Sequence, residues 1–160
     1  MTIDSLAQQL QAAQQEVVAS LASATEHELH TALGDGEWTA SEVAAHVIEM
    51  QAMWMEKIAN ADQEPDLARS HSEIDRRTAS VDAHSGDDLG AITRRLAESC
   101  GRTMDILQSM SSGDLGRPVT HGHSSTSGTA QEAAHSLVIS HLSEHARQIT
   151  ETRQAAGRGQ

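Results

Sequence analysis

At 160 residues the chain fits a single domain, and it is long enough to bury an ordinary hydrophobic core. Its one cysteine, Cys100, excludes an internal disulfide framework, and its net charge of −12, from 23 acidic and 11 basic residues, predicts no nucleic-acid partner because such a surface repels phosphate. No run approaches the roughly 18 consecutive apolar residues of a membrane span, and no leader pattern opens the chain, so we expect a cytoplasmic protein without a membrane partner.

The first predicted helix follows Asp4, which we interpret as its N-cap. Apolar residues then recur every three or four positions, at Leu6, Leu10, Ala13, Val17 and Leu21. The stretch 25–35 is ambiguous, because Leu29 and Leu33 extend the apolar pattern only as far as Gly34 and Gly36. Phenylalanine and tyrosine are absent, which disfavours a β-rich fold.

The second helix has the clearest start. Thr39 and Glu42 form a capping box, with Trp38 before them as a hydrophobic staple. The buried stripe is then Val43, Val47, Met50 and Trp54, and we expect the helix to end near Asn60.

Residues 62–87 are polar and carry no sustained apolar period. We interpret them as a long connection rather than a fifth core helix, with Ile74 and Val81 able to anchor a short turn. Such a length of chain can travel back along a whole helix, so a crossover between the second and third helices is feasible.

The third helix is predicted to start at Asp87 or Asp88 and to stop at Gly113. Its apolar face is Leu89, Ile92, Leu96, Cys100, Met104 and Leu107. Residues 111–128 indicate an exposed loop, and a Thr129–Glu132 capping box opens a fourth helix that runs to about Ala156. The sequence therefore predicts an all-α, four-helix bundle without strands, in one domain over 1–160 with about 157–160 as a flexible tail.

The ten histidines suggest a metal site. His141 and His145 lie one turn apart beside apolar neighbours, so both imidazoles should face the bundle interior, where they can bind one ion. His46 has the same setting on the second helix and is the natural third ligand. For any one of them the alternative is a buried imidazole hydrogen-bonded within the core, although three together would need several separate partners.

The remaining histidines are expected to have other roles. His121 and His123 flank a loop glycine and could supply a ligand or touch a substrate, whereas His135 should face another side of the fourth helix. Solvated roles are expected for His27, His30, His71 and His84.

Two segments resemble the signatures of the DinB/YfiT-like superfamily: WTASEVAAH, ending at His46, and HLSEHARQI, beginning at His141. The resemblance implies an up-down-down-up bundle, often dimeric, in which His46, His141 and His145 bind the metal. Some members of the superfamily are thiol-dependent transferases or isomerases. A homodimer is therefore expected.

The favoured function is a metal-dependent enzyme acting on a small molecule, a thiol-dependent S-transferase or related isomerase or hydrolase. Three imidazoles leave a coordination position open for a thiol cosubstrate or a water. Zinc and nickel are favoured, with iron and manganese open. No catalytic residue is assigned, although Glu49 and Glu144 are conceivable acid/base groups. The alternatives are a non-catalytic metal-binding or metal-stabilised dimeric bundle, and a metal-free bundle for partner recognition.

Overall fold

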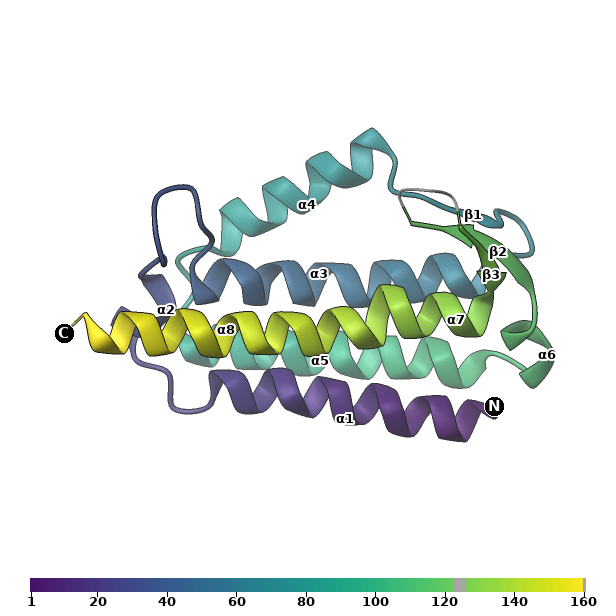
Figure 1. Cartoon of the computed structure of the whole chain (residues 1–160), viewed down its shortest axis with the longest axis horizontal. Coiled ribbons are helices and arrows are strands. Elements are labelled where there is room, and N and C mark those ends of the chain that lie inside the picture. The colour runs from purple at the N-terminus through teal and green to yellow at the C-terminus, as the bar shows by residue number, and fades with distance from the viewer. Residues whose placement is uncertain (123–125, 160) are drawn as a thin grey trace.

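Four long helices lie side by side in the computed structural model, which describes residues 1–122 and 126–159 (Figure 1). Both α1 and α3 pack against α5 and α8. The four-helix bundle predicted from the sequence is therefore confirmed. Its long helices are α1 (Ile3–Leu21), α3 (Ala40–Ala59), α5 (Leu89–Ser109) and α8 (Ser140–Arg158).

The chain crosses the molecule between α3 and α5. Followed by colour in Figure 1, α3 and α5 run in the same direction, and α1 and α8 run in the opposite one. The return passes through β1 (Asp66–Leu67) and α4 (His71–His84), and α4 lies over α3, outside the bundle.

Most helix starts follow the predicted capping chemistry. Thr39 and Thr129 each form a capping box with the glutamate three residues on, and Asp88 caps α5. The prediction for α1 is wrong by two residues, because the backbone N–H of Ser5 donates to the Thr2 hydroxyl (3.1 Å) and Asp4 lies inside the helix. A further box at Thr25 opens a short helix, α2 (Glu26–His30).

The core contains a chain of polar side chains among the predicted apolar stripes. Gln14 Nε2 donates to Gln51 Oε1 (3.1 Å), Gln51 Nε2 donates to Ser99 Oγ (3.0 Å), and Ser99 Oγ donates to the Ile48 carbonyl (2.7 Å). These bonds join α1, α3 and α5 in the interior and satisfy groups that would otherwise be costly to bury. The surrounding fully buried residues include Leu6, Leu10, Val43, Met50, Ile92, Leu96, Leu142 and Ile149.

The crossover is more ordered than predicted. A capping box between Ser70 and Glu73 starts the 14-residue helix α4. Val81 is the one buried residue of α4, so this stretch of sequence has no apolar periodicity from which a helix could be predicted. An ion pair of 3.0 Å between Glu73 and Lys57 joins α4 to α3. The predicted short turn is therefore a helix held partly by polar contacts.

The expectation of no strands and of a plain loop at 111–128 is wrong. That segment contains a short helix, and its two strands join β1 in a sheet of order β1-β2-β3, with β1 and β2 parallel and β2 and β3 antiparallel. The strands are too short to produce a readable alternation. Gly122, with φ of +83°, follows β2. The new elements are α6 (Ser112–Leu115), β2 (Pro118–His121) and β3 (Thr126–Thr129).

The last helix begins with a change of winding. After α7 (Ala130–Ala134), a π-helical segment (His135–Ile139) leads into α8, which passes the expected break at Gly157 and ends at Arg158. Such segments are frequent at functional sites, and this one immediately precedes the two histidines of α8. Across residues 1–122 and 126–159, no helix is both long and apolar enough to span a membrane.

Candidate metal centre

Three half-buried histidines from two helices meet inside the bundle. The ring centroids of His46, on α3, and His145, on α8, are 4.9 Å apart with perpendicular planes. The His141 and His145 centroids are 6.0 Å apart. Residues nearly 100 positions apart in the chain therefore present imidazoles to one region, as the sequence interpretation requires.

These separations suit a shared ion. Metal–nitrogen distances of about 2.0–2.1 Å and a tetrahedral angle would place imidazole centroids about 5 Å apart. Within the described part of the chain, however, no three His, Cys, Asp or Glu side chains form a metal cluster as they stand. The His46–His145 and His141–His145 separations therefore suit a shared ion, while the side chains as placed do not form a ligand cluster.

Hydrogen bonds orient the two rings on α8. His141 Nδ1 lies 3.1 Å from the Leu137 carbonyl, in the π-helical segment, and His145 Nδ1 lies 2.9 Å from Gln148 Oε1. Both partners are acceptors, so each Nδ1 carries the proton and each Nε2 keeps a free lone pair. This is the tautomer in which a histidine binds metal through Nε2.

The His46 ring is covered rather than anchored. Its Nδ1 is buried and has no hydrogen-bond partner among the residues described. The Trp38 ring packs against it, with centroids 5.3 Å apart. A buried ring nitrogen without a partner is costly, and a metal ion would satisfy it.

Two of the three histidines, His46 and His145, are favoured in the neutral form. Burial, followed by the nearby charges of His145, Arg69 and Arg77, lowers the pKa of His46 from 6.5 to about 3. Burial also lowers the pKa of His145, against the opposing hydrogen bond to Gln148. Neutral imidazole is the form that binds metal, so His46 and His145 need lose no proton near pH 7.

Of the two glutamates considered from the sequence, one is engaged in an ion pair and the other is exposed to solvent. Arg69 holds both carboxylate oxygens of Glu49, at 3.1 and 2.9 Å, and its guanidinium also lies 5.6 Å from the centre of the Trp54 ring. Glu144 is exposed on α8. Glu49 is therefore engaged, whereas the Glu144 charge is near enough to oppose the lowering of the His145 pKa.

The sequence interpretation did not identify several residues that contact or influence the histidine rings. Leu137 and Gln148 lie four residues before His141 and three after His145, so helical spacing could have identified them as partners of those rings. Arg69 and Arg77 had no such signal, because the crossover has no apolar period from which to place them.

The other histidines lie in separate contacts. His84 Nδ1 lies 2.9 Å from Asp87 Oδ2, His30 Nε2 lies 3.1 Å from the Asp87 carbonyl, and His135 Nδ1 lies 3.4 Å from Ser140 Oγ. His121 ends β2. His123 lies outside the described residues, so its predicted role as a ligand or substrate contact stays a prediction.

Cys100 packs as expected of a buried free thiol. It is half-buried against the core, and burial raises the pKa of its thiol despite a 3.5 Å contact from Gln51 Nε2. A protonated, packed thiol is a poor nucleophile.

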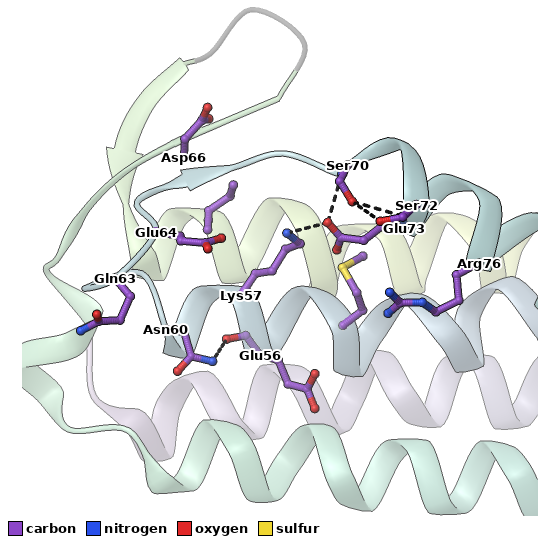
Figure 2. Close-up of a pocket in the computed structure, with 12 residues that line it drawn as sticks. Glu56, Lys57, Asn60, Gln63, Glu64, Asp66, Ser70, Ser72, Glu73 and Arg76 are labelled. Carbon is purple, nitrogen blue, oxygen red and sulfur yellow. Dashed lines mark hydrogen bonds and ion pairs between the residues drawn. The ribbon is translucent and has the colours of Figure 1, made fainter.

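A cavity of about 580 Å³ lies elsewhere, between α3, β1 and α4 (Figure 2). Its wall carries both signs of charge, with Lys57 and Arg76 among four acidic side chains. None of the three histidines lines it. We therefore treat it as distinct from the candidate metal centre.

Comparisons with known proteins agree with this fold. A family model described as the DinB superfamily matches residues 9–149. The structure of YfiT from Bacillus subtilis, described as a probable metal-dependent hydrolase, matches with a TM-score of 0.72 at 21% identity, over 97% of this chain and 87% of that one. No curated protein sequence matches significantly.

Two further solved structures share the fold at lower identity. A mycothiol-dependent maleylpyruvate isomerase matches with a TM-score of 0.66 at 16% identity, over 98% of this chain and 61% of the isomerase. The colibactin self-resistance protein ClbS, in complex with double-stranded DNA, matches with a TM-score of 0.69 at 10% identity, over 96% of each chain.

The ClbS complex corrects the prediction that nucleic acid is excluded as a partner. That prediction was wrong because it used the net charge, which sums the whole surface, whereas phosphate contacts depend on local groups of basic side chains. Arg76, Arg95 and Arg102 do line one surface hollow, although three glutamates share it.

Proposed function

The chain belongs to the DinB superfamily, and on that premise we propose that it is a metal-dependent enzyme acting on a small molecule through His46, His141 and His145. The convergence of three imidazoles from α3 and α8, with centroids 4.9 and 6.0 Å apart, carries the proposal. The buried Nδ1 of His46, which has no hydrogen-bond partner among the described residues, supports it independently.

The surrounding residues would prepare the centre for an ion. Gln148 and the Leu137 carbonyl fix the two rings on α8, and Trp38 shields the third from water. Zinc and nickel suit three imidazoles best, and iron and manganese also accept them. When bound, the ion would supply a Lewis acid with an open position, where a thiol or water loses its proton.

A thiol-dependent S-transfer, or a related isomerisation or hydrolysis, is the favoured reaction class. Relatives with this fold are described as metal-dependent and as mycothiol-dependent, which supports a thiol cosubstrate. The engagement of Glu49 by Arg69 also suits it, because a metal-bound thiolate attacks without a general base. The proposal includes a homodimer, which rests on the family resemblance.

The engagement of Glu49 by Arg69 equally favours a second candidate, a non-catalytic metal-binding bundle. The two differ in the fourth coordination position. Displacement of a metal-bound water by an added thiol is expected of the enzyme, whereas a metal held only for stability needs no exchangeable position.

Metal content tests the ligand set. Protein stripped with a chelator and reloaded with zinc is expected to retain about one ion per chain, and His46→Ala, His141→Ala and His145→Ala are each expected to lose most of it. His71→Ala, at an exposed position of α4, is the control and should retain the wild-type content. Wild-type zinc content in all three ligand variants, shown by circular dichroism to be folded, would overturn the proposal.

A further inference from the structure

The cavity between α3, β1 and α4 holds two opposite charges apart (Figure 2). The Glu64 carboxylate and the Arg76 guanidinium both line it, and among the described residues neither side chain makes a hydrogen bond or an ion pair. In Figure 2 they extend into the cavity from opposite sides, Glu64 from the turn before β1 and Arg76 from α4.

The other charged side chains of the cavity wall already have partners. These contacts are Lys57–Glu73 (3.0 Å), Arg102–Glu56 and Thr120–Asp66 (2.9 Å). A cation beside Glu64 and an anion beside Arg76 would therefore complete the pairing of the wall.

Contacts with α3 show where the two charged residues are anchored. The Glu64 backbone N–H donates to the Asn60 carbonyl at the end of α3 (3.2 Å). Arg76 lies nearly one turn of α4 beyond the glutamate that pairs with Lys57, and α4 runs opposite to α3. Arg76 therefore lies opposite about Met53, which also lines the cavity.

The two anchor points are separated by about 10 Å of α3, at about 1.5 Å per residue. The space between them is lined by neutral side chains that include Ser70, Gln63 and Leu67, and by Lys57, whose charge is already paired. A cavity of about 580 Å³ is of the size that takes a small molecule.

Fixed opposite charges select a ligand that carries both complements. Hydrogen bonds between charged groups are stronger than those between neutral ones, and the guanidinium fork of arginine matches a carboxylate in a bidentate pair. A molecule with one charged group could satisfy only one end of this cavity.

We propose that the cavity binds a small zwitterion, with its ammonium group at Glu64 and its carboxylate at Arg76. The ligand class is that of ω-amino carboxylates and short peptides, in which several bonds separate the two charged groups. The inference does not depend on a metal, because none of the three histidines of the candidate centre lines the cavity.

Three six-carbon probes that differ only in their end groups test the inference. 6-Aminohexanoate carries both charges, hexanoate carries only the carboxylate, and hexylamine carries only the ammonium group. Their affinities are measured by NMR titration of ¹⁵N-labelled protein. 6-Aminohexanoate is expected to bind about tenfold or more tightly than either of the others, the effect of one charged hydrogen bond, and to shift the amide signals of residues around the cavity.

Each end of the cavity has its own variant. Glu64→Gln should remove the preference for 6-aminohexanoate over hexanoate, and Arg76→Gln should remove the preference for 6-aminohexanoate over hexylamine. Glu16→Gln on α1 and Arg94→Gln on α5 make the same changes of charge at exposed positions outside the cavity, so both preferences should survive in them.

Several results would overturn the site. These are equal affinities of the wild type for the three probes, no measurable binding of 6-aminohexanoate, signal shifts confined to another face, or control variants that lose the preferences as the cavity variants do. Circular dichroism of each variant establishes that the fold is retained. His46→Ala should bind 6-aminohexanoate as the wild type does, so failure of the metal centre and failure of this site are distinguishable.

Discussion

Gln148 is expected to control the metal affinity without touching the metal. Its Oε1 lies 2.9 Å from His145 Nδ1, so it fixes the ring and its tautomer. Loss of such a partner typically weakens metal binding 10–100-fold, which is about 1.4–2.7 kcal/mol. Gln148→Ala is therefore expected to raise the dissociation constant for zinc by that factor, whereas Gln148→Glu, which keeps an acceptor in place, should remain close to wild type.

Competition with a chromophoric chelator measures this affinity. Gln154→Ala is the matched control, because it removes an exposed glutamine from the same helix. The reasoning would be refuted if Gln148→Ala and Gln154→Ala bound zinc equally well, or if Gln148→Glu bound as poorly as Gln148→Ala. Urea unfolding of the metal-free variants separates a change in affinity from a change in stability.

Three further outcomes are expected. The pKa of His46 is about 3 in the folded chain against 6.5 unperturbed, so the unfolded state takes up the proton first as the pH falls. The free energy of unfolding of the metal-free protein should therefore decrease as the pH falls from about 6.5 toward 3. Urea unfolding at several pH values measures this dependence, which His46→Gln should reduce; an unchanged pH dependence in that variant would contradict the expectation. Because burial raises the pKa of the Cys100 thiol, a disulfide reagent should modify native protein far more slowly than unfolded protein, and equal rates would count against the packing described. Thr39→Ala removes the acceptor of the Glu42 backbone N–H and should cost about 1 kcal/mol by urea unfolding, with no measurable change speaking against the capping box.

The long helices were predictable because their signals are local. The capping boxes at Thr39 and Thr129 set the starts of α3 and α7, and apolar residues at helical spacing set the buried faces. The same patterns placed His46 and His141 on inward stripes. Whether the two buried faces bring their histidines together depends on how the helices pack, so the ring separations come from the structure alone.

The missed elements depend on contacts between distant residues. Helix α4 packs through the Glu73–Lys57 pair and one buried valine, a combination without periodicity. The strand β1 exists because it pairs with β2, more than 50 residues later. Arg77 likewise affects the pKa of His46 only because α4 packs on α3, which no local pattern reveals.

X-ray absorption at the zinc edge tests the central claim most directly. Zinc-loaded protein is expected to show three imidazole nitrogens at about 2.0–2.1 Å and one oxygen ligand from water. An added thiol should replace that oxygen with a sulfur at about 2.3 Å. In His46→Ala the number of imidazole ligands derived from the spectrum should fall by one. Four protein ligands with no change on adding thiol, or an imidazole count that does not depend on His46, would contradict a three-histidine centre with an open position.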